Sequence, residues 1–198
     1  LQYFAKYQKP SGFKFALDGF HNVPDKIPYC ALYCLNPPAA LYTNGDKNLI
    51  HLNSNFNWDS PYCSPQFLEG FVTFRDVPFD KNLTLIIDVK SVIFKKKGTL
   101  PVFSSVGWTA LPIFSPDGYV QSGIYQLPIF KGTVPKDILE QLPENDPWPF
   151  LMDKLNEKKS KLQLLEPMSA VVRLLDGQRE VRCVFVIVKY VGTLPNPL

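Results

Sequence analysis

The sequence has little of what catalysis and metal binding require. It contains only two histidines, and neither lies in a recognisable catalytic motif. Its four cysteines, Cys30, Cys34, Cys63 and Cys183, form no CxxC pair and have no nearby histidine, which argues against a zinc site. No residue pattern supplies a partner that would stabilise a Cys63 thiolate, and the acidic residues do not cluster as metal ligands do. We therefore expect a protein that is not an enzyme and that has no cofactor and no bound metal.

The chain also lacks a large excess of positive or negative charge. The formal net charge of +3 is well below the basic balance of most dedicated nucleic-acid binders, and the basic residues are not interleaved with aromatic ones as in base-stacking surfaces. Long apolar runs and a charged-then-apolar leader are missing as well. The sparse cysteines suit a reducing compartment. We expect a cytoplasmic protein that does not bind nucleic acid.

Aromatic residues and proline, by contrast, are abundant. Aromatics make up 14% of the chain, and nineteen prolines divide it into short segments, which favours many short strands over long helices. The clearest alternation of inward and outward residues lies in 70–75 and 83–89. Further strands are expected over 13–17, 28–35, 49–52, 102–111 and 169–175, with 180–191 closing a final hairpin. These patterns predict a single all-β domain.

Two segments near the C-terminal third have a helical pattern. Residues 135–142 begin with proline and carry early acidic residues, as the first turn of a helix does. Residues 150–165 place leucines at spacings that a helix gathers on one side. We expect a helical insertion at about 135–165 that packs over one edge of the sheet. The predicted organisation is a lead-in over 1–12, one domain over 13–191 and a tail over 192–198.

The most informative stretch runs from Gly107 to Gly132. Two apolar runs that both end in Leu-Pro-Ile-Phe flank Ser115-Pro116-Asp117-Gly118, a sequence that suits a type I turn between two strands. The stretch contains no nucleophile and no metal ligands, so its role is expected to be structural. Five large residues are predicted to lie in the core: Trp58, Trp108, Phe114, Leu127 and Phe130.

The order of these motifs resembles a C2 domain. The segments FALDGFHNVPDKIPYCALY (15–33), NFNW (55–58), LTLIIDVKSV (83–92) and VGWTALPIF with SGIYQLPIF (106–114 and 122–130) are similar to successive C2 motifs. The form is closest to divergent C2 domains of phosphoinositide 3-kinases and of coiled-coil scaffold proteins of cilia and centrosomes. The resemblance covers about 13–190 and implies an antiparallel β-sandwich of about eight strands.

The resemblance also implies that this domain does not use calcium. C2 domains that bind calcium use aspartates from two loops, because a hard cation needs several carboxylate oxygens. Here Asp25 matches one such position, but the usual Asp-Pro-Tyr is replaced by Ile27-Pro28-Tyr29. The third loop carries Lys90 and the run from Lys95 to Lys97 instead of an acidic pair.

Lys95, Lys96 and Lys97 form the sharpest charge feature. They would contact anionic lipid or an acidic partner protein, or they form a solvated loop tip. Our hypothesis is a non-enzymatic C2-like interaction module of a larger cytoskeletal or ciliary scaffold, which docks protein partners without calcium. The alternative is a peripheral membrane domain that binds anionic lipid weakly through this basic loop.

Overall fold

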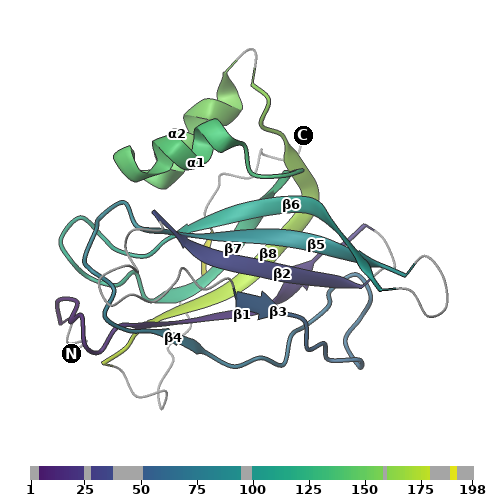
Figure 1. The fold of residues 1–198 in the computed structure, drawn as a ribbon, viewed down its shortest axis with the longest axis horizontal. Coiled ribbons are helices and arrows are strands. Elements are labelled where there is room, and N and C mark those ends of the chain that lie inside the picture. The colour runs from purple at the N-terminus through teal and green to yellow at the C-terminus, as the bar shows by residue number, and fades with distance from the viewer. Residues whose placement is uncertain are drawn as a thin grey trace.

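The computed structural model describes residues 5–24, 28–37, 51–94, 100–157, 160–178 and 188–190 (Figure 1). In chain order its elements are β1 (Phe13–His21), β2 (Tyr29–Asn36), β3 (His51–Asn53), β4 (Val72–Phe74), β5 (Thr84–Ile93), β6 (Val102–Pro112), β7 (Gly123–Lys131), α1 (Lys136–Gln141), the 3-10 turn η2 (Leu142–Glu144), α2 (Pro147–Asn156), β8 (Leu164–Asp176) and β9 (Val188–Tyr190). The predicted all-β fold with a short helical insertion is confirmed.

The strands form one curled sheet made of two halves. Eight of the nine described strands follow the order β3-β2-β5-β6-β7-β8-β1-β4, with four on each side of the contact between β6 and β7, and β9 pairs with β7 off this path. Neighbours along this order are antiparallel, and the pairing of β6 with β7 is short: only Gly107 with Lys131 and Trp108 with Phe130 are in register. The layers of the sandwich are thus the two halves of one hydrogen-bonded sheet.

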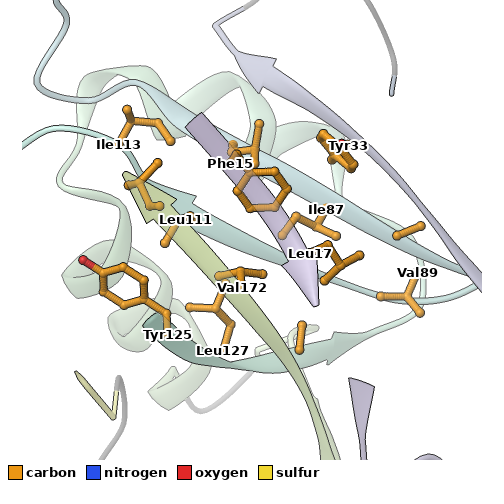
Figure 2. Close-up of a cluster of buried hydrophobic side chains, with 14 of the residues drawn as sticks. Phe15, Leu17, Tyr33, Ile87, Val89, Leu111, Ile113, Tyr125, Leu127 and Val172 are labelled. Carbon is orange, nitrogen blue, oxygen red and sulfur yellow. The ribbon is translucent and has the colours of Figure 1, made fainter. Parts of the chain in front are cut away.

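The main core lies between the two halves. On β5 the inward residues Leu85, Ile87 and Val89 are fully buried there, which follows the period of two that the sequence shows. Figure 2 shows side chains from both halves pointing toward one another across this space. The labelled residues come from β1 (Phe15, Leu17), β2 (Tyr33), β5 (Ile87, Val89), β6 and the residue after it (Leu111, Ile113), β7 (Tyr125, Leu127) and β8 (Val172).

A second apolar cluster lies on the outer face of the sheet, under the helices. Trp108 of β6 stacks on Phe130 of β7 with ring centroids 4.8 Å apart, and Ile138, Leu142 and Leu151 cover them. The helical insertion therefore packs on the outer face of the sheet at its middle strands, whereas the sequence predicted that it would cover an edge. A helix has one apolar stripe, and the two large rings at the middle of the sheet give that stripe the larger area to bury.

The second helix differs from its predicted limits. α2 begins at Pro147, a residue that suits the first helical turn, and ends at Asn156. The predicted helix over 150–165 is therefore wrong over 160–165, where Leu162 is buried in the outer cluster from a non-helical segment and Leu165 belongs to β8; residues 158–159 lie outside the described residues. The leucines at helical spacing are therefore divided among α2, the connection that follows it and β8.

The segment before β1 belongs to the folded unit. The Tyr7 hydroxyl donates a hydrogen bond to the Val77 carbonyl oxygen at 2.8 Å, and its ring lies 4.5 Å from that of Phe114. Burial raises the pKa of Tyr7 above its usual value. Residues 5–12, which the sequence predicted as a lead-in, are irregular in structure but packed against the core.

In the Gly107–Gly132 stretch the predicted turn forms, but the strands that flank it pair over only a short length. The predicted turn is present, because the Gly118 amide donates to the Ser115 carbonyl oxygen at 3.0 Å and Gly118 has a φ of 87°. The strands on either side do not form a continuous hairpin, since β6 and β7 pair only at the end far from the turn and the Phe114–Val120 bridge beside the turn is isolated. β9 pairs with β7 in parallel, so 188–190 do not form the predicted final hairpin with the preceding strand, and the rest of the predicted strand over 180–191 lies outside the described residues.

We predict that Gly107→Ala destabilises the fold by about 1–3 kcal/mol, the usual range for a group forced into a packed site. A Cβ at this position would lie 2.4 Å from Ile129 Cγ2 and 2.7 Å from the Phe130 carbonyl oxygen. The measurement is chemical unfolding followed by tryptophan fluorescence. Gly70→Ala is the matched control, because a Cβ at position 70 would have nothing within 4 Å; equal stability of the two variants would contradict the prediction.

Candidate interaction surface at the loop end of the sheet

Three connections meet at one end of the sheet, which we call the loop end. β2 begins beside the end of β5, where the Val92 amide donates to the Pro28 carbonyl oxygen at 2.9 Å. The β1–β2 connection contacts the β3–β4 connection through the Val23 amide and the Cys63 carbonyl oxygen at 3.0 Å. The described parts of the β1–β2, β3–β4 and β5–β6 connections therefore lie at the same end, on the right in Figure 1.

The ends of β5 and β6 extend beyond their neighbours as a two-stranded arm. β2 starts opposite Ser91 and β7 ends opposite Gly107, yet β5 and β6 stay paired as far as Ile93 and Val102. No described strand flanks the arm on either side. Its apolar side chains consequently face solvent: Ile93, Phe94, Leu100, Val102 and Phe103 are all exposed, with Phe94 at 66% and Leu100 at 88%.

Two aromatic residues of the β3–β4 connection add to this exposed surface. Trp58 is 85% exposed and Tyr62 is 75% exposed. Trp58 was predicted to lie in the core, and this prediction is wrong. Phe56 and Phe67, joined by an antiparallel bridge, fill the inward position, and the chain then turns outward through the hydrogen bond from the Ser60 amide to the Asn57 carbonyl oxygen at 3.0 Å.

The other four residues predicted for the core are buried. Phe114 and Leu127 lie in the main core between the two halves, whereas Trp108 and Phe130 form the centre of the outer cluster. Sequence reasoning identified these residues as apolar and strand-forming. It did not separate the two faces of the sheet. Trp108 and Leu111 are three residues apart, and residues an odd number apart in a strand point to opposite faces.

The lysines grouped by the sequence analysis occupy different places. Lys95, Lys96 and Lys97 lie outside the described residues, as does Asp25. Lys90 is on β5, where its Nζ lies 2.6 Å from Asp88 Oδ2 and donates to the Ser105 hydroxyl. This ion pair compensates the charge of Lys90 within the sheet, so Lys90 does not act as an unpaired positive charge like those expected of the run from Lys95 to Lys97.

Three further observations on the described residues concern metal binding, thiol reactivity and membrane-spanning helices. Among them, no group of three or more His, Cys, Asp or Glu residues is arranged to hold a metal ion. Burial raises the pKa of the Cys30 and Cys34 thiols, which lowers the fraction of reactive thiolate. Within the described chain there is also no helix with the length and apolarity to cross a bilayer.

Comparison with known proteins gives no family. No family model matches the chain, and no curated protein matches it. The interpretation of the loop end accordingly rests on its own residues: an arm of exposed apolar side chains, two exposed aromatic rings and three consecutive lysines next to the arm in the sequence.

We predict opposite outcomes for two tryptophan truncations. Trp108→Ala removes a fully buried ring and should cost about 3–5 kcal/mol of unfolding free energy, whereas Trp58→Ala should change it by less than about 0.5 kcal/mol. Chemical unfolding followed by circular dichroism gives both values. A large loss of stability from Trp58→Ala would show that this ring has a structural role.

Proposed function

We propose that the chain is a non-enzymatic, C2-like interaction module whose loop end binds an anionic membrane surface. The observation that carries the proposal is the position of the exposed apolar side chains. Phe94 and Leu100 border the segment that contains Lys95, Lys96 and Lys97, so apolar and basic groups are adjacent in the chain. An interfacial lipid-binding surface combines these two kinds of group.

The magnitudes favour joint action of the two kinds of group. Each lysine near an anionic bilayer contributes about 1 kcal/mol, so three lysines supply about 3 kcal/mol. A dissociation constant in the micromolar range corresponds to about 8 kcal/mol. The remainder requires burial of apolar surface in the interfacial region, and Phe94, Leu100 and Trp58 are large apolar side chains that are exposed at the loop end.

The fold supports the C2-like part of the proposal. Eight of the nine described strands follow one path with four in each half, which is similar to the number that the motif resemblance implies, and β9 is an addition to it; the loop end is where the motifs LDGFHNVPDK and LTLIIDVKSV lead. Docking to an acidic protein of a cytoskeletal or ciliary scaffold would use the same lysines. The exposed apolar arm favours the membrane, because an acidic protein surface alone gives no reason for large apolar side chains around the basic run.

We predict that the module sediments with vesicles containing phosphatidylserine and that two kinds of variant weaken this differently. Replacing Lys95, Lys96 and Lys97 with alanine should abolish most of the salt dependence of binding. The double variant Phe94→Ala with Leu100→Ala should weaken binding at least tenfold while the salt dependence remains.

Phe79→Ala is the matched control for these variants. Phe79 is also exposed but packs against Phe114, at the opposite end of the sheet from the arm, so its loss should leave binding unchanged. Failure of the unmodified protein to bind at low salt would contradict the membrane proposal. If an acidic protein partner then bound through the same lysines, the scaffold-docking version would take its place.

We further predict that vesicle binding is the same in millimolar calcium and in a chelator. The third loop has lysines where calcium-binding C2 domains have acids, and like charges repel the cation. Flotation of vesicles with the protein under both conditions measures this directly. Binding that rises with calcium would overturn the calcium-independent part of the proposal and would point to Asp25, which lies outside the described residues.

A further inference from the structure

Serine-proline dipeptides are concentrated at the loop end. The sequence contains three of them, Ser60-Pro61, Ser64-Pro65 and Ser115-Pro116. The first two lie four residues apart in the β3–β4 connection, beside Trp58 and Tyr62, whereas the third lies in the turn between β6 and β7 at the opposite end of the sheet. Proline after serine is the feature that proline-directed protein kinases recognise, since it offers no backbone N–H to the kinase.

The three hydroxyl groups differ in how firmly the fold holds them. Ser60 Oγ donates to the Asn57 carbonyl oxygen at 2.6 Å and accepts from the Gln66 amide at 3.2 Å. Ser115 Oγ accepts from the Tyr119 amide at 3.2 Å. Both therefore belong to hydrogen bonds that close a turn.

Ser64 is held differently. Its Oγ lies 3.2 Å from His21 Nδ1 in an exposed side-chain contact, and within the described part of the chain no hydrogen bond ties this hydroxyl to the backbone. Ser64 itself is half-buried, whereas the adjacent Cys63 and Tyr62 are exposed. A phosphoryl group on Ser64 would cost one contact with a surface histidine, whereas on Ser60 it would break two bonds that shape the connection.

We propose that Ser64 is a phosphorylation site for a proline-directed serine/threonine kinase and that its phosphate releases the loop end from the membrane. Ser64 Oγ forms a bond to the γ-phosphorus of ATP, the bond from that phosphorus to the β–γ bridging oxygen breaks, ADP leaves, and the hydroxyl proton passes to the catalytic base of the kinase. The regulatory part rests on the proposed membrane function, while the modification itself does not.

The direction of the effect follows from charge. A phosphoserine carries about −1.5 to −2 charges at pH 7. The β3–β4 connection lies at the same end as the apolar arm, so this charge would oppose approach to an anionic bilayer and would offset one or two of the lysines. Vesicle binding should fall about tenfold on phosphorylation of Ser64.

The experiment treats the full chain with a proline-directed kinase and ATP, maps the phosphate by mass spectrometry and then measures sedimentation with phosphatidylserine vesicles. We expect labelling at Ser64 that is lost in Ser64→Ala and retained in Ser60→Ala and Ser115→Ala. The labelled protein should bind vesicles about tenfold more weakly, and mock treatment without ATP should leave binding unchanged. Neutral phosphatidylcholine vesicles should not distinguish the labelled from the unlabelled protein.

The outcomes separate this inference from the proposed function. No phosphate at Ser64, with labelling at Ser60 or Ser115 instead, overturns the site assignment. Labelling at Ser64 with unchanged binding to anionic vesicles overturns the release mechanism. If the unlabelled protein does not bind vesicles at all, the membrane function and the release mechanism both fail, and labelling of Ser64 in that case still supports the site assignment.

Discussion

The structure depends on the short contact between β6 and β7. Two residue pairs, Gly107 with Lys131 and Trp108 with Phe130, join the halves of the sheet, and the absence of a side chain at Gly107 lets the two strands approach. The inward side of the contact faces the main core. Its outward side presents the stacked Trp108 and Phe130 rings on which the helices pack. One small junction therefore determines both apolar clusters.

The same junction explains why the loop end is exposed. Because β7 ends opposite Gly107, the first residues of β6 continue without a neighbour on that side, and β2 begins too late to cover β5 on the other. The arm that remains has the backbone pairing of a sheet but lacks flanking strands among the described residues. Apolar side chains that would be core residues in a longer sheet, such as Phe94 and Phe103, are left in solvent.

The sequence predicts the parts of this fold that depend on local patterns. Alternation in 83–89 and the Ser115–Gly118 turn are confirmed, because each follows from side-chain period or from turn chemistry within a few residues. Parts that depend on distant contacts were not predictable. Trp58 is exposed because Phe56 and Phe67 pair across the connection, and α2 ends at Asn156 while Leu162 reaches the outer cluster from a non-helical segment.

The candidate site, too, is predicted by the sequence only where it depends on local patterns. The lysine run is visible in the sequence, but Lys90 is indistinguishable from it until the structure pairs Lys90 with Asp88. The apolar half of the surface is not visible at all, because Phe94 and Leu100 have the composition of strand residues and only the missing neighbours expose them. Since the arm adds little to either apolar cluster, its side chains can change without loss of the fold. The residues that stabilise the fold and the exposed residues of the proposed surface are thus different residues of β5, β6 and the positions next to them.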